Sequence, residues 1–168
     1  MPESSKPVFL VDAYADPVVV RIDGRASFLN SGSLKDFLAG MIQQGKRRFV
    51  VDFRQCASMD STFLGVLAGA AIELRRQNPP GQLTLVRVGE RNLELIRNLG
   101  LHRLAVVDPG SQSADPMGYS QALNEQARGE VENARLMLEA HENLVATDPA
   151  NAAKFQDVLT FLKARLGS

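Results

Sequence analysis

The stretch RFVVDFRQCASMDSTFLGVLAGA, residues 48–70, decides the fold. Its first six residues are apolar almost throughout, which suits a central strand covered on both faces. A polar connection follows, and from Phe63 to Arg76 the pattern is that of a helix whose small residues on one side let it lie close to a sheet. Asp60 or Ser61 stands where a residue that caps this helix is expected. The stretch therefore predicts a buried strand that leads through a polar turn into a closely packed helix.

The flanking sequence repeats this alternation of strands and helices. Residues 18–24 are rich in β-branched side chains and end in a turn signal, which fits a strand. Apolar residues at steps of three and four within residues 34–42 mark one face of a helix, and Gly100 ends a short helix at residues 90–99. Further strands are expected at residues 8–11 (as an edge strand), 83–88 and 104–107. The order predicts an α/β fold, an open mixed β-sheet with crossover helices on one face and further cover on the other.

The last third of the chain follows a different pattern. Residues 1–110 form the α/β domain, and residues 111–118 have the composition of a linker. Two amphipathic patterns follow within residues 119–168: one helix to about residue 145, and a second opened by Asp148 as N-cap and Pro149. We expect a C-terminal α-helical hairpin. Its apolar stripes need burial, against the uncovered face of its own sheet, against a second copy in a homodimer, or against another partner.

Composition excludes several functional classes. The 19 Lys and Arg balance the 19 Asp and Glu, so the overall charge does not favour nucleic acid or an anionic membrane as partner. No apolar run is long enough to span a bilayer and the first residues do not resemble a signal peptide, so we expect a cytoplasmic protein without direct membrane insertion. The single cysteine, Cys56, and the histidines His102 and His141 suggest neither a disulfide nor a metal site.

No catalytic motif or cofactor motif is evident either. Nucleotide loops of the Walker type and the G-x-S-x-G elbow of serine hydrolases are absent from the sequence, and neither histidine has a supporting motif that would activate a serine. We therefore expect no cofactor, no catalytic residue and no enzymatic activity.

The chemistry with the best support is a modification of the loop before the helix. Backbone N–H groups in the first turn of a helix lack intrahelical partners, and the helix dipole favours an anion there. A phosphate on Ser61 would meet both. The simpler alternative is that capping of the helix alone explains Asp60, Ser61 and Thr62.

From about Val18 to Val107 the chain resembles the STAS domain of bacterial anti-sigma-factor antagonists. The resemblance rests on residues 18–26, on the strand at residues 49–53, and on Met-Asp-Ser-Thr-Phe-Leu-Gly-Val-Leu at residues 59–67. It continues through residues 83–86 and the Leu-Gly-Leu end of the helix at residues 93–101. It covers slightly more than half of the chain and leaves the C-terminal hairpin outside.

This resemblance implies a phosphorylation switch. In the family, the residue after the Asp is phosphorylated by a partner that is both anti-sigma factor and serine kinase, and a phosphatase resets it. By position the phosphoacceptor is Ser61, with Thr62 next best. The chain departs from the family at Phe63, where Gly is common, and at Arg25, where antagonists often carry an acid. The partner-binding surface implied by the resemblance consists of Arg25, Ser27, Asp60, Ser61, Thr62 and Phe63.

Two functions of different classes remain open. The first is a transcription-regulating binding module that binds an anti-sigma serine kinase and is switched at Ser61. The second is a scaffold subunit without phosphorylation, in a transporter-associated or stressosome-like complex. If the hairpin covers the sheet or the loop around Ser61, we expect it also to inhibit binding.

Overall fold

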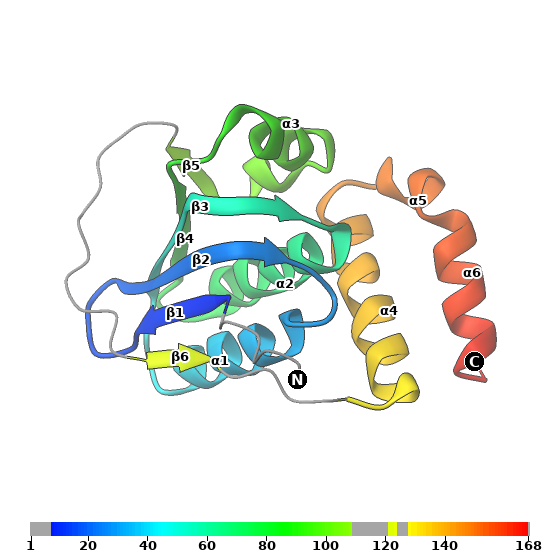
Figure 1. The fold of residues 1–168 in the computed structure, drawn as a ribbon, viewed down its shortest axis with the longest axis horizontal. Helices are drawn as coiled ribbons and strands as arrows, with labels where there is room; N and C mark the ends of the chain where they lie inside the picture. Colours follow the sequence, from blue (N-terminus) through cyan, green and yellow to red (C-terminus); the bar gives the residue numbers. More distant parts are fainter. Residues whose placement is uncertain (1–7, 109–120, 124–127, 168) are drawn as a thin grey trace, which may run out of the picture.

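The computed structural model describes residues 8–108, 121–123 and 128–167. Its centre is a six-stranded sheet with the order β5-β4-β3-β2-β1-β6 (Figure 1). β2, β3, β4 and β5 are parallel, and β1 is antiparallel to both of its neighbours. The strands are β1 (Phe9–Asp12), β2 (Val18–Ala26), β3 (Arg48–Met59), β4 (Gln82–Val86), β5 (Val106–Asp108) and β6 (Gln121–Leu123). The predicted mixed sheet with crossover helices is confirmed.

Helices α1 (Ser31–Gln43) and α2 (Ser61–Arg76) cover one face of the sheet. The strands send alternate side chains towards them, as the two-residue period requires. In the parallel register Val20 lies beside Val51, and Val51 beside Leu85, and all three are fully buried. Figure 1 shows no described helix over the opposite face, so the predicted cover on that side is not found among the described residues.

Helix α3 (Glu90–Asn98) and a 3-10 turn (Leu101–Arg103) connect β4 to β5. Gly100, at φ 82°, lies between them in the left-handed conformation that glycine adopts most readily. The buried side chains of Ile96, Leu99 and Leu101 close one end of the core. The predicted end of this helix at Gly100 is confirmed.

The C-terminal region contains α4 (Glu130–Thr147), α5 (Asn151–Lys154) and α6 (Gln156–Arg165). The predicted first helix is wrong at its start, because residues 121–123 form β6 and pair with β1. β1 would otherwise present unpaired backbone groups at the sheet edge, so β6 takes the edge position that was predicted for residues 8–11. The predicted linker at residues 111–118 lies outside the described residues.

The helical hairpin packs on α2 rather than on the open face of the sheet. Figure 1 shows α4 between α2 and α6, with α5 at the corner of the hairpin. The oxygen Oδ1 of Asp148 accepts a hydrogen bond from the N–H of Ala150 at 3.1 Å, but α5 begins at Asn151 with Ala150 as its N-cap, so the predicted N-cap position of Asp148 is wrong. No helix in the described residues has both the length and the apolar character needed to cross a bilayer.

Phe63 lies at the centre of the core. Its side chain is 0% exposed. Its ring stacks on Phe9, with centroids 6.0 Å apart, and meets the edge of Phe53 at 6.2 Å. Such aromatic contacts add to the free energy of burial. The prediction that Phe63 belongs to the partner-binding surface is therefore wrong, because the apolar ring is used to join α2 to β1 and β3.

We predict that Phe63→Ala lowers the free energy of unfolding by about 3 to 5 kcal/mol, because it removes buried aromatic area and leaves a cavity. Urea denaturation followed by circular dichroism measures this change. Phe161→Ala is the matched control, because Phe161 is 62% exposed and its removal should change stability by less than about 0.5 kcal/mol. Equal losses in the two variants would contradict the central position of Phe63.

Candidate functional site

Asp60 connects the first turn of α2 to the loop between β2 and α1. It has an extended backbone (φ −112°, ψ 175°) and is the N-cap of the helix. Its Oδ1 accepts a hydrogen bond from the N–H of Phe63 at 2.9 Å, and its Oδ2 accepts one from the N–H of Phe28 at 2.8 Å. Of the two capping residues that the sequence allowed, Asp60 is the one used. One carboxylate thus holds the loop between β2 and α1 against the first turn of α2.

The loop between β2 and α1 is shaped by its own polar residues. The N–H of Ser27 donates to Oδ1 of Asn30 at 3.0 Å, and the hydroxyl of Ser31 donates to the backbone oxygen of Ser27 at 2.6 Å. Ser27 is only 8% exposed, so its predicted place on the partner-binding surface is wrong. The outer part of this loop is apolar, since Leu29 is 62% exposed.

Ser61, the first residue of α2, is half-buried and contacts the C-terminal hairpin. Its Oγ lies 2.8 Å from Nε2 of His141 on α4. The other ring nitrogen, Nδ1, lies 2.6 Å from the backbone oxygen of Met137. A carbonyl oxygen only accepts hydrogen bonds, so Nδ1 carries a proton and, in the neutral ring, Nε2 accepts the proton of the Ser61 hydroxyl. The Ser61 hydroxyl therefore donates to a histidine from a segment outside the STAS resemblance.

His141 is part of the site although sequence reasoning passed over it. It is 3% exposed, and its ring meets the edge of Phe155 with centroids 4.7 Å apart. The sequence places it on a helical stripe near the buried Ala140 and Leu144. That stripe predicts burial, but no local signal pairs it with Ser61.

The structure brings together only part of the predicted partner-binding surface. Ser61 and Asp60 are half-buried at the start of α2, and Arg25 is exposed near the end of β2. Thr62 is 3% exposed, so its side chain is not available as a second phosphoacceptor in this conformation. Arg25 and the neighbouring Leu29 are therefore exposed, whereas Asp60 and Ser61 are only half-exposed.

Cys56 lies near the end of β3, half-buried and close to the same region. Burial raises the pKa of its thiol to about 11, although hydrogen bonds with the Ser58 backbone and the Asn92 side chain act in the opposite direction. Since the thiolate is the reactive form, Cys56 is a poor nucleophile at neutral pH.

We predict that, at pH 8, iodoacetamide alkylates Cys56 more slowly than it alkylates the thiol of free glutathione. The reason is that the raised pKa leaves almost all of the Cys56 thiol protonated. Intact-mass spectrometry over time measures the rate. The same chain in urea provides the control, and its thiol should react at the rate of an unperturbed cysteine. If Cys56 in the folded chain were alkylated at the same rate as in urea, the conclusion that the fold protects this thiol would be wrong.

We predict that Asp60→Ala lowers the free energy of unfolding by about 1 to 3 kcal/mol, because it removes the cap and the bond to the neighbouring loop. Hydrogen exchange should rise at the amides of both Phe28 and Phe63. Asp60→Asn is the matched variant: its side chain has one acceptor oxygen, so only one of these two amides should lose protection. Unchanged exchange at both amides in Asp60→Ala would contradict the connecting role of Asp60.

Comparison with known proteins shows the family to which this chain belongs. A family model described as "Mlab, STAS domain" matches residues 9–109, which excludes α4, α5 and α6. A putative anti-sigma factor antagonist from Thermotoga maritima has a similar fold, with 18% identity, a TM-score of 0.51, and coverage of 60% of this chain and 85% of its own. The Bacillus cell fate determinant SpoIIAA in its phosphorylated form has 20% identity, a TM-score of 0.50, and coverage of 59% and 89%. The search of curated proteins found no significant match. The chain belongs to the STAS domain family.

Proposed function

We propose that this chain is a regulatory binding module of the anti-sigma-factor-antagonist kind, switched by phosphorylation of Ser61. The carrying observation is the position of Ser61 as the first residue of α2, directly after the capping Asp60. The match to the STAS family supports a regulatory role, and the fold is similar to that of an antagonist solved in its phosphorylated form. The partner is an anti-sigma factor with serine kinase activity, a phosphatase resets the switch, and both act in the cytoplasm.

Electrostatics explain how the modification would act. Phosphorylation replaces the neutral Ser61 hydroxyl by a group of charge about −1.5 to −2, next to the carboxylate of Asp60. The N-terminus of α2 tolerates this charge, because its N–H groups and dipole favour anions. A partner surface that fits the uncharged loop then meets a concentrated negative charge. The modification therefore weakens binding while leaving the helix intact.

A second function is favoured by one specific contact. The hydrogen bond from Ser61 to the buried His141 gives Ser61 a structural role that requires no phosphate. In this alternative the chain is a scaffold subunit of a larger complex, and Asp60 and Ser61 serve only to begin α2 and hold α4. The two functions differ in whether Ser61 is ever modified.

The deciding experiment is phosphopeptide mass spectrometry on the protein from its own cells, during growth and under stress. The switch requires phosphate on Ser61 that changes with condition. Consistent absence, with the peptide containing residues 60–62 well covered, would contradict the switch and favour the scaffold.

We predict that Ser61→Asp abolishes capture of a protein kinase partner from lysate, whereas Ser61→Ala retains it under all growth conditions. The added carboxylate reproduces part of the charge of a phosphate, and the alanine cannot be modified. Ser58→Asp is the matched control, because Ser58 is exposed three residues away and adds the same charge outside the proposed site. Equal capture by all three variants would disprove the proposed switch.

A further inference from the structure

Helix α4 lies on the face of α2 that begins with Ser61. Two glycines of α2, one and two turns beyond Ser61, permit the contact. A side chain at Gly65 would collide with the backbone of Ala140, and one at Gly69 would collide with the side chain of Asn143. Rotation of a side chain cannot move these backbone atoms away. The close approach of α4 therefore requires glycine at position 65.

Polar contacts continue along this helix pair. The hydroxyl of Ser61 bonds to Nε2 of His141 at 2.8 Å, and Nδ2 of Asn143 donates to the backbone oxygen of Gly65 at 3.2 Å. The hydroxyl that would receive a phosphoryl group therefore faces a histidine that is 3% exposed. In this conformation α4 therefore lies directly against the Ser61 hydroxyl, and Ser61 is half-buried.

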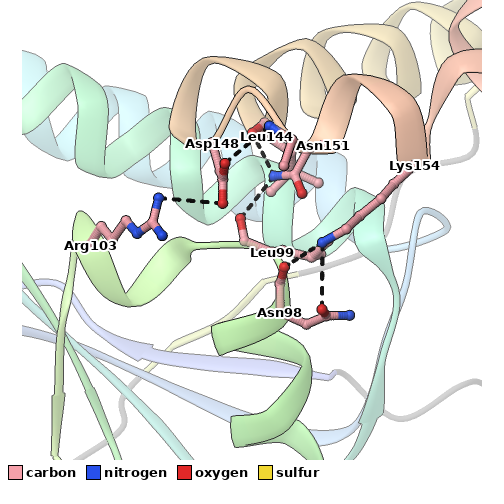
Figure 2. A network of polar contacts seen from close by, with 8 residues as sticks. Asn98, Leu99, Arg103, Leu144, Asp148, Asn151 and Lys154 are labelled. Carbon is pink, nitrogen blue, oxygen red and sulfur yellow. Dashed lines mark hydrogen bonds and ion pairs between the residues drawn. The ribbon is translucent and has the colours of Figure 1, made fainter.

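The corner of the hairpin, where α4 leads into α5, is anchored to the end of α3. Figure 2 shows Asn151 and Lys154 reaching from α5 to the end of α3. Nδ2 of Asn151 donates to the backbone oxygen of Leu99 at 2.9 Å, and Nζ of Lys154 donates to the backbone oxygen of Asn98 at 2.6 Å. Asn151 is fully buried. This corner can retain the hairpin on the domain while α4 shifts on α2.

The middle of α4 also meets α1 through polar side chains. An exposed ion pair joins Lys35 of α1 to Glu139 at 2.6 Å, and such pairs contribute little to stability. A cavity of about 290 Å³ remains between α1, α2 and α4, with Val66 and Gly69 among its lining residues. Incomplete packing lowers the dispersion energy that holds a helix in place. The contact of α4 with α2 is therefore suited to local opening.

We propose that residues 128–167 form an intramolecular cover over the start of α2, so that a kinase reaches Ser61 only when α4 has moved away. This inference rests on the proposed function for its biological role. In the open form the Ser61 oxygen attacks the terminal phosphorus of a nucleoside triphosphate bound to the kinase. The bond to the leaving diphosphate breaks, and a base of the kinase takes the hydroxyl proton. In the closed form the oxygen is held against His141 instead.

The cover can be tested without knowing the kinase. We use the full chain with Ser61→Cys as a reporter and Cys56→Ser to remove the native thiol, and we follow labelling by the disulfide reagent DTNB. The closed chain should react much more slowly than the same chain in urea. Gly65→Ala should raise the native rate by about tenfold or more, because the added methyl group collides with Ala140 and favours opening.

Gly40→Ala on α1 is the matched control, because nothing lies within 4 Å of the added carbon. It should leave the labelling rate unchanged. A second pair of variants avoids the core: Glu139→Lys and Lys35→Glu should each raise the rate about two- to fivefold, since each places like charges together. The double variant, which restores opposite charges, should return the rate to that of the parent.

Circular dichroism first establishes that each variant is folded. Equal labelling rates in the Gly65→Ala and Gly40→Ala chains would overturn the cover, as would a parent that reacts as fast in buffer as in urea. The proposed switch fails by a different result: no phosphate on Ser61 in cells, even for the Gly65→Ala chain. The labelling experiment does not depend on that result, so the two failures are distinguishable.

Discussion

The carboxylate of Asp60 is the interaction on which the site depends. Through its two oxygens it fixes the first turn of α2 and the loop between β2 and α1, which come from opposite sides of β3 in the chain. Because a cap holds a helix end in one place, the same bonds set the position of Ser61. The core aromatic group around Phe63 begins only three residues later, so the loop stands on a rigid base.

Helix α2 joins two layers with different chemistry. Its large apolar residues, such as Leu64 and Leu67, are fully buried in the core that it shares with the sheet. Its glycines, Gly65 and Gly69, face α4 instead. Small residues on that side bring two helix backbones together but bury little apolar area for each residue. The contact with the sheet maintains the fold, and α4 joins the same core through the fully buried Leu144.

The cover and the switch share the hydroxyl of Ser61. In the closed structure this group serves as a donor to His141, whereas in the proposed function it serves as a phosphoacceptor. The two roles exclude each other, which is the physical basis for coupling the position of α4 to modification. The family match ends at residue 109, so the proposed coupling would join Ser61 of the STAS domain to a helix outside that domain.

The sequence by itself determined the α/β domain and the place of Ser61 at the start of a helix. Apolar periodicity and capping residues are local, and local patterns are readable without knowledge of distant contacts. Only the tertiary structure decided that Phe63 is buried, that residues 121–123 form a strand, and that His141 reaches Ser61. Each of these depends on contacts between segments that are distant in the sequence. An aromatic ring, an edge strand or a histidine can be buried or hydrogen-bonded by many different partners, and the local sequence does not specify which one. An amphipathic hairpin requires burial, but its sequence does not specify the surface that provides it.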